Sequence, residues 1–352
     1  MNKLRYEKQI KLKGFGLPAQ ELLHNSKVLI IGAGGLGTPC AQYLNGAGVG
    51  TIGLIDDDII SLSNLPRQTL YNENEVGLHK IEVLFKKLKL QNPDTNLICH
   101  KEFLVPENAL LIIKNYDLVI DASDNFGTRY LVNDSCVILN KPFIYGAVYE
   151  FEGQVSVLNY MGGPTYRCLF AENDGPDESL NCDDNGILGV LPALIGTYQA
   201  IEAIKIITSI GTVLSGQLLI IDTLSQTHFK IAVLIKPENK NIVELKSFYS
   251  TPTCTNAVQL IDGAALRNWL IKDKNVQLID VRTADEFATN SLPGAKNIPL
   301  ADLDNRKVEI DFSWPVVTIC ATGNRSKQAA LILVKVGNIG EVFSLKGGLS
   351  SL

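Results

Sequence analysis

The stretch Val28-Leu-Ile-Ile-Gly32-Ala-Gly-Gly-Leu-Gly37 decides the fold of the first part of the chain. Four apolar residues of strand length run straight into a glycine-rich turn, and a helical pattern follows. Asp56 stands nineteen residues beyond Gly37, at the end of the next apolar run. Such glycines let phosphate oxygens approach backbone N–H groups at a helix N-terminus, and the acid can accept hydrogen bonds from a ribose. The pattern predicts a nucleotide site, and a tight packing turn without a ligand is the alternative. The predicted phosphate-binding glycines are Gly32, Gly34, Gly35 and Gly37.

Outward from this stretch, strand-length apolar runs alternate with helix-length amphipathic runs as far as about residue 240. This alternation predicts an α/β fold with a Rossmann-like, mostly parallel sheet. Gly153–Leu158 alternates apolar and polar residues, which predicts an antiparallel extension of that sheet. Pro192–Thr208 predicts a long helix buried on most sides. Further strands are expected at 51–55, 118–121 and 143–148, and further helices through 40–44, 80–90 and 135–139.

A polar stretch at 236–255 separates this pattern from a second, shorter α/β pattern. The composition shift predicts a first domain at 1–240, a linker at 241–256 and a smaller domain at 257–352. The last of these is long enough to fold alone.

Composition excludes several classes of function. The 352 residues carry a net charge of −5 and are 46% hydrophobic, so a globular chain is expected and a nucleic-acid partner is not. Charges near Met1 argue against a signal peptide, and seven scattered cysteines suit free thiols in a reducing, cytoplasmic compartment. The uncharged run 185–201 is shorter than the roughly 20 residues of a membrane span, so none is expected.

Charged residues follow the predicted strands in a pattern that is unusual for a nicotinamide enzyme. Asp58, Asn64, Arg67, Lys80 and Asp124 all lie in segments expected at the carboxyl ends of strands, where α/β folds bind ligands. Cations and carboxylates together suit a triphosphate with Mg²⁺. Each residue alone is more commonly a solvated loop charge, and the combination carries the prediction.

Six motifs in register make a family resemblance specific. They resemble the sulfur-carrier adenylyltransferases of molybdopterin and thiazole biosynthesis, in the superfamily of ubiquitin-activating enzymes, over about residues 1–236. The motifs are Arg5-Tyr6-x-x-Gln9, Gly32-x-Gly34-Gly35-Leu36-Gly37, Asp56-x-Asp58, Ser61-x-Ser63-Asn64-Leu65-x-Arg67-Gln68, Gly77-x-x-Lys80 and Asp121-x-x-Asp124-Asn125.

The resemblance implies an enzyme that uses Mg-ATP to adenylate the C-terminal glycine of a ubiquitin-like sulfur carrier, in a homodimer. By position, Asp56 would hold the ribose, and Asp124 would hold Mg²⁺. Asn64, Arg67 and Lys80 would neutralise the phosphates. Asp58 belongs to the same predicted nucleotide site.

Two positions depart from that family. Where the family commonly has a second arginine that reaches the partner's site, this chain has Lys8, a point charge in place of a bidentate fork. The family's zinc usually sits on two Cys-x-x-Cys pairs, of which this chain keeps Cys168. One thiolate cannot build a tetrahedral site, so we predict no zinc.

Cys182 precedes a segment, Gly186–Pro192, that resembles the one after the family's functional thiol. The resemblance implies an acyl-disulfide or thioester link to the carrier. The alternative is a small apolar loop residue. Neighbouring acids would raise the pKa of this thiol.

The C-terminal part resembles the rhodanese sulfurtransferase domain over most of 258–350. Its motifs are Asp280-Val-Arg282-x-x-x-Glu286, Leu292-Pro-Gly294-Ala295 with Pro299, and Cys320-Ala-Thr-Gly323-Asn-Arg325-Ser326. Cys320 follows a predicted strand and precedes a helix, so loop N–H groups and Arg325 are expected to lower its pKa and hold a persulfide anion.

Together the two parts predict a two-step enzyme: adenylation of a carrier with ATP, then sulfur transfer from Cys320 to give a thiocarboxylate. A cysteine desulfurase is a possible sulfur donor. A nicotinamide-dependent oxidoreductase on the same fold and a catalytically degenerate carrier-binding protein are the alternatives.

Overall fold

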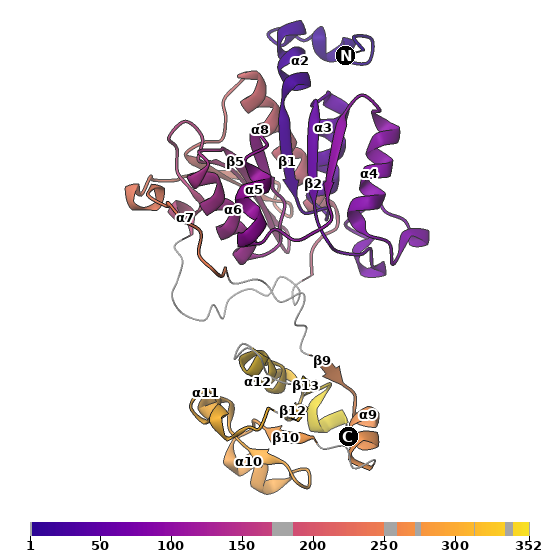
Figure 1. Ribbon diagram of the computed structural model, residues 1–352, viewed down its shortest axis with the longest axis vertical. Coiled ribbons are helices and arrows are strands. Elements are labelled where there is room, and N and C mark those ends of the chain that lie inside the picture. Colours follow the sequence, from indigo (N-terminus) through magenta and orange to yellow (C-terminus); the bar gives the residue numbers. More distant parts are fainter. Residues whose placement is uncertain are drawn as a thin grey trace. The chain divides into compact units, whose positions relative to one another are not determined.

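The computed structural model describes residues 2–170, 186–249, 259–271, 276–312, 314–334 and 341–351. The chain divides into two compact units, residues 1–252 and 253–352 (Figure 1). The division falls inside the segment expected as a linker. Tyr249 is nevertheless buried in the first unit, where its hydroxyl donates to Asp134 at 2.7 Å.

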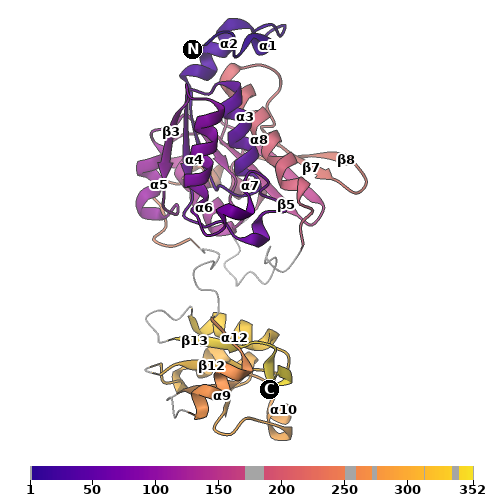
Figure 2. The ribbon, with the colours of Figure 1, turned by 90° about the vertical axis from the view of Figure 1, so that its right-hand side faces the viewer.

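An eight-stranded sheet forms the first unit, in the order β3-β2-β1-β4-β5-β6-β7-β8. The five strands from β3 to β5 are parallel, and β6, β7 and β8 continue the sheet antiparallel. This is the mixed sheet expected from the sequence, and Figure 2 shows the β7–β8 hairpin at its edge. The strands are β1 Lys27–Ile31, β2 Thr51–Ile55, β3 Asn96–His100, β4 Leu118–Asp121, β5 Phe143–Tyr149, β6 Glu152–Leu158, β7 Gln217–Asp222 and β8 Thr227–Ala232.

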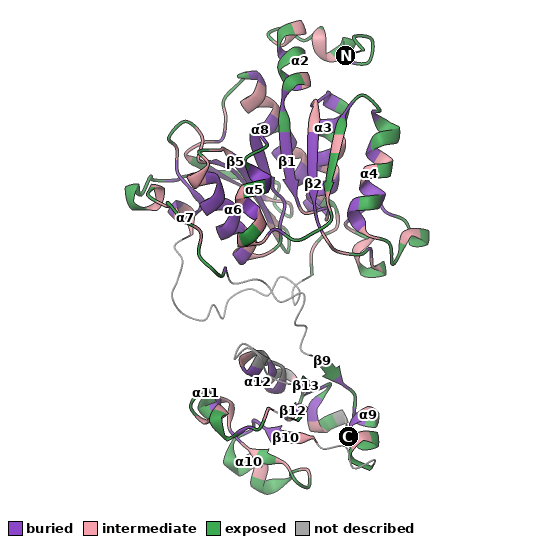
Figure 3. Cartoon of the chain, viewed as in Figure 1, coloured by how far each residue is buried: buried purple, intermediate pink, exposed green. Residues whose placement is uncertain are grey.

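Helices cover both faces of this sheet. α3, α4 and α8 pack over one apolar cluster, whereas α5 and α6 pack over the other. Central strands are therefore buried along their length, while the outer side of α4 is exposed (Figure 3). The helices are α1 Glu7–Ile10, α2 Gly16–Asn25, α3 Gly37–Ala47, α4 Lys80–Gln91, α5 Pro106–Ile113, α6 Phe126–Ile138, α7 Tyr166–Leu169 and α8 Val190–Thr208, with 3₁₀ turns at Leu62–Asn64, Glu73–Glu75 and Pro237–Lys240.

Two helices differ from the sequence expectation. The helix expected at 135–139 begins much earlier, because the Asn125 side chain accepts from the Thr128 N–H at 2.7 Å and caps α6. α8, expected to be buried on most sides, passes the length and composition test for a membrane span, and 44% of the 18-residue window that passes it is buried in the structure. A core helix passes the same test, so the absence of a membrane span stays a prediction. The buried Glu202 accepts from the Leu214 N–H at 3.0 Å, a contact that ties α8 to the loop before β7.

The second unit contains a five-stranded parallel sheet in the order β11-β10-β12-β13-β9. It is built around the apolar strand β12, which runs into the Cys320 loop. Its strands are β9 Gln259–Ile261, β10 Gln277–Asp280, β11 Lys296–Asn297, β12 Val316–Ile319 and β13 Val342–Leu345. Its helices are α9 Gly263–Ile271, α10 Ala284–Thr289, α11 Leu303–Arg306 and α12 Asn324–Val334, with 3₁₀ turns at Leu300–Asp302, Lys307–Glu309 and Gly348–Ser351.

Candidate functional sites

The glycine-rich turn joins β1 to α3 and fits only residues without side chains. Gly32 has a φ of +98°, and a Cβ there would lie 2.7 Å from the Ala122 carbonyl oxygen. A Cβ at Gly37 would lie 1.8 Å from the Gly32 carbonyl oxygen. The turn is therefore pressed against the end of β4, and the N–H groups at the start of α3 lie at the carboxyl edge of the sheet.

Asp56, which directly follows β2, holds this turn in place through hydrogen bonds. One carboxylate oxygen accepts from the Ala33 N–H at 2.7 Å, and the other accepts from the Asp58 N–H at 2.7 Å. Burial raises the pKa of Asp56, and the nearby Lys80 ammonium opposes that shift. The carboxylate predicted to hold a ribose thus already orders the loop that would receive the phosphates.

Lys80 begins α4 and reaches the same edge. Its side chain is only 8% exposed, and its ammonium lies 2.8 Å from the Asp58 carboxylate, which is 47% exposed. Tyr71 reinforces the arrangement, because its buried hydroxyl donates to the Ala33 carbonyl at 2.8 Å and lies 3.3 Å from the Lys80 carbonyl oxygen. The role of Tyr71 could not be predicted from the sequence, since no spacing relates it to the glycine turn.

The segment with Asn64 and Arg67 lies beside the turn. Asn64 accepts from the Ser61 N–H at 3.2 Å, and Arg67 donates to the Ser63 carbonyl at 2.9 Å. A Cβ at Gly35 would lie 3.0 Å from the Arg67 carbonyl oxygen. Arg67 is half-buried, so its guanidinium is partly open to solvent.

Asp124 follows β4 at this edge and is exposed. Its neighbour Asn125 caps α6, while Asp121 is fully buried and accepts from the Ser123 hydroxyl at 2.6 Å. Asp124 therefore remains an exposed carboxylate close to the glycine turn. Exposed carboxylates of this kind fit Mg²⁺, a hard cation that keeps several waters.

α8 completes the site through two glycines that the sequence analysis did not single out. A Cβ at Gly196 would lie 2.1 Å from the Leu36 carbonyl oxygen, and one at Gly189 would lie 2.2 Å from that of Pro66. Pro192 lies in the same way against Gly35. The amino end of α8 therefore supports both the glycine turn and the Arg67 segment.

Lys8 does not join this group. Lys8 is exposed on α1, whose neighbour Gln9 donates to the Ala47 carbonyl at the far end of α3. Since α3 has 11 residues, that end lies about 15 Å from the glycine turn. Lys8 thus lies away from the nucleotide site of its own subunit, and Cys182 lies outside the described residues.

Among the described residues, the groups that contact the Cys168 sulfur are hydrogen-bond partners and not metal ligands. The Lys236 N–H donates to its sulfur at 3.4 Å, and the Thr165 hydroxyl and Asn239 amide lie at 3.4 and 3.9 Å. Burial raises the pKa of this thiol, but these hydrogen bonds outweigh it and lower the pKa. The described residues contain no group of three His, Cys, Asp or Glu side chains that could hold a metal. This donor set does not fit zinc.

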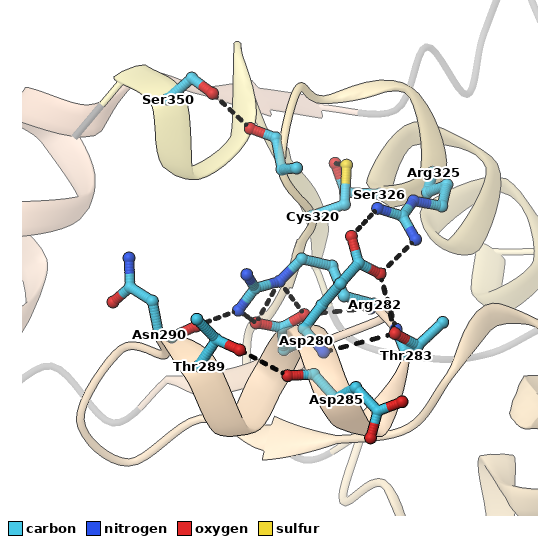
Figure 4. Close-up of polar contacts among 12 residues, drawn as sticks. Asp280, Arg282, Thr283, Asp285, Thr289, Asn290, Cys320, Arg325, Ser326 and Ser350 are labelled. Carbon is cyan, nitrogen blue, oxygen red and sulfur yellow. Dashed lines mark hydrogen bonds and ion pairs between the residues drawn. The ribbon is translucent and has the colours of Figure 1, made fainter.

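Cys320 lies between β12 and α12 in the second unit (Figure 4). Its sulfur accepts from the Gly323 N–H at 3.1 Å and lies 3.4 Å from the Ser326 hydroxyl. Burial raises the pKa of the thiol, but the hydrogen bonds from Ser326, Gly323 and Thr322 outweigh it and lower the pKa. The loop is therefore a cradle for a sulfur anion.

Arg325 does not hydrogen-bond to the sulfur. Its two terminal nitrogens donate to both oxygens of Glu286, at 2.7 and 2.8 Å. Glu286 is fixed from its other side by the Thr283 N–H and hydroxyl, at 3.0 and 3.1 Å. The nearby Arg282 is bound to the buried Asp280. Glu286 was visible in the sequence as a motif residue, but its partner was not.

Comparison with known proteins identifies the family of each part of the chain. Residues 6–244 match the ThiF family, and residues 264–352 match the rhodanese-like domain. A "Probable molybdopterin-synthase adenylyltransferase" of Porphyra purpurea is 41% identical over 99% of this chain and 92% of its own length. An "Adenylyltransferase and sulfurtransferase MOCS3" of Drosophila sechellia is 40% identical over 92% of this chain and 77% of its own.

Among solved structures, Escherichia coli MccB in complex with MccA-N7isoASN has a TM-score of 0.60 at 23% identity. The match covers 67% of this chain and 73% of that one, and it supports the fold of the first unit. The family resemblance expected from the sequence is thus confirmed. The chain belongs to the ThiF family, and it is an ATP-using adenylyltransferase that continues into a rhodanese-like sulfurtransferase domain.

Proposed function

We propose that the first unit adenylates the C-terminal glycine carboxylate of a ubiquitin-like sulfur carrier, and that Cys320 then supplies the sulfur of a thiocarboxylate. One observation supports the adenylation step. The edge of the sheet that holds the glycine turn also holds the segments of Lys80, Arg67 and Asp124. The relatives' names, which join adenylyltransferase to sulfurtransferase, support the sulfur-transfer step. Nothing in the structure or the comparisons favours a nicotinamide oxidoreductase or a degenerate binding protein.

The first step requires an anionic carboxylate to attack the α-phosphate of ATP, with pyrophosphate leaving. Charge repulsion is the barrier, so cations aimed at the phosphates lower it. Lys80 and Arg67 supply the cations, and the N–H groups at the start of α3 supply further donors. The carboxylate is already ionised at pH 7, so no general base is needed.

Asp124 would hold Mg²⁺. The ion, when bound with ATP, neutralises phosphate charge. Lys80 is released from Asp58 to the phosphates as the nucleotide binds, because phosphate oxygens offer it a stronger negative charge than one carboxylate does.

For the second step, a persulfide on Cys320 attacks the acyl carbon and AMP leaves, which joins carrier and enzyme through an acyl disulfide. The thiolate of a small-molecule thiol then attacks the Cys320 sulfur, which forms a mixed disulfide on Cys320 and releases the thiocarboxylate. A second thiol reduces that disulfide and regenerates the Cys320 thiol. The resemblance offers Cys182 as a thiol that links to the carrier as an acyl disulfide or thioester. The Cys320 loop contributes N–H donors that keep the terminal sulfur anionic and nucleophilic.

We further propose a cytoplasmic homodimer supplied by a cysteine desulfurase. Lys8 lies away from the nucleotide site of its own subunit, so a contact with phosphate requires the site of a second copy. The domain limits 1–240 and 257–352 are part of this proposal.

Carrier-dependent exchange of pyrophosphate into ATP tests adenylation. Arg67→Ala, Lys80→Ala and Asp124→Ala should each lower exchange by roughly a hundredfold or more, since each removes a charge from the reacting phosphates. Lys86→Ala, on the exposed side of the same helix as Lys80, is the control and should exchange normally. Cys182→Ala should also exchange normally. Wild-type exchange in the first three variants would refute the assignment of this pocket.

A further inference from the structure

Glu286 is paired with Arg325, a residue of the same segment as the Cys320 loop. Both terminal nitrogens of Arg325 donate to its carboxylate. The Glu286 pKa is lowered to about 2, chiefly by the Arg325 hydrogen bonds and then by the Thr283 N–H. At neutral pH the pair therefore presents no net charge.

The pair lies within electrostatic range of the sulfur, since a Cys320 thiolate is one of the charges that raise the Arg325 pKa. Other nearby charges cancel as well, because Arg282 is paired with the buried Asp280. The described sulfur contacts come from Ser326 and from N–H groups of the loop. A donor anion that approaches Cys320 would thus meet the N–H dipoles of the loop, while Glu286 would offset the positive charge of Arg325.

We infer that Glu286 is a specificity-determining residue for the sulfur donor: it disfavours small dianionic donors and leaves the site to sulfane sulfur on weakly charged donors, such as a persulfide held by a protein. The inference rests on the proposed sulfur transfer at Cys320.

The loading step balances for both classes of donor. With thiosulfate, the Cys320 thiolate attacks the outer sulfur, a new S–S bond forms, and sulfite leaves with the electrons of the broken S–S bond. With a persulfide anion, the same attack on the terminal sulfur releases a thiolate. No oxidant or reductant is consumed in either case.

The test compares two small donors that differ by one charge. Thiosulfate is a dianion, and methanethiosulfonate is a monoanion that gives up sulfane sulfur in the same way, releasing methanesulfinate. If the Glu286 carboxylate lies about 6 Å from the bound donor, removing its negative charge should speed loading about tenfold for thiosulfate and about threefold for methanethiosulfonate at low salt. Glu286→Gln keeps an amide oxygen for the Thr283 cap, so the loop should stay folded.

The measured quantity is the ratio of the two loading rates, followed by cyanide-labile sulfur on the full chain. In Glu286→Gln this ratio should rise about threefold at low salt, and about 1 M KCl should remove most of the rise, because both side chains are 37% exposed. Asp285→Asn, an exposed acid on the same helix, is the matched control and should keep the wild-type ratio. A purely structural role for Glu286 would change both rates together.

An unchanged ratio in Glu286→Gln, or an equal rise in Asp285→Asn, would overturn the inference. Cys320→Ala separates this outcome from failure of the proposed function. If Cys320→Ala takes sulfur from neither donor, Cys320 is the sulfur acceptor, and the ratio of loading rates then tests the role of Glu286 alone. If it loads both at the wild-type rate, the sulfur site lies elsewhere and both proposals fail.

Discussion

Replacing Asp58 with Asn should destabilise the first unit in the absence of ATP. It should also increase the rise in melting temperature that ATP causes. The change removes the partner of Lys80, whose ammonium lies 2.8 Å from the Asp58 carboxylate and whose side chain is 8% exposed. Lys80 is then left nearly buried without an ion-pair partner, and the Asp56 carboxylate is the nearby negative charge that remains. ATP phosphates restore an ion-pair partner.

The expected loss of stability follows from the exposed fractions of the Lys80 and Asp58 side chains. Exposed ion pairs contribute about 0 to 1 kcal/mol, whereas removing one partner of a fully buried pair costs about 3 to 5 kcal/mol. With one partner buried and the other 47% exposed, we expect about 2 kcal/mol. For a unit of this size that is roughly 4 to 8 °C in melting temperature.

Thermal melts of the full chain, with and without ATP and with EDTA to exclude metal, measure both effects. Asp57→Asn is the matched control, because that neighbouring carboxylate faces His79 at 4.0 Å and does not pair with Lys80. The reasoning predicts a larger ATP-induced shift in Asp58→Asn than in the wild type. A smaller shift would refute the reasoning, because it would mean that the Asp58 carboxylate strengthens ATP binding more than its hold on Lys80 weakens it. An unchanged melt of the ATP-free protein would show that the ion pair contributes nothing to stability.

Three further outcomes are expected. Gly196→Ala should destabilise the protein by about 1–3 kcal/mol, seen as a lower melting temperature, and should raise the KM for ATP. The reason is that the new Cβ would lie 2.1 Å from a carbonyl oxygen of the glycine turn. Gly186→Ala is the control and should change neither quantity, because the space around Gly186 is open. The rate at which iodoacetamide alkylates Cys320 should rise with pH and reach half its maximum below pH 9, because the lowered pKa of the thiol keeps it ionised at lower pH. Ser326→Ala should move this midpoint to higher pH, because it removes a hydrogen bond to the thiolate. Elemental analysis should find far less than one zinc per chain, and stoichiometric zinc would show that Cys168 has ligands we have not identified.

The sequence predicted the sheet well because its strands carry their own signals. An apolar run ending in a glycine turn has few other structures open to it, and Asp56 stands where that fold places a ribose ligand. Motif order likewise predicted which charged residues would share an edge.

Contacts between segments distant in sequence escaped prediction. Nothing in the spacing indicates that Tyr71 would join the glycine turn to α4, or that Gly196 would lie against Leu36. Arg325 shows the same limit: its position beside Cys320 suggested a sulfur ligand, but Glu286, 39 residues earlier, takes its hydrogen bonds. Local patterns define elements, whereas side-chain partners depend on packing that only three-dimensional structure shows.

The central claim is that one chain both activates a carrier and delivers its sulfur through Cys320. Mass spectrometry of a ubiquitin-like sulfur carrier, incubated with the enzyme, ATP, Mg²⁺ and a persulfide donor, tests it most directly. The account predicts a carrier in which sulfur replaces one C-terminal oxygen with wild-type enzyme, and none with Cys320→Ala, although that variant still catalyses pyrophosphate exchange. Thiocarboxylate formed by Cys320→Ala at the wild-type rate would contradict the claim.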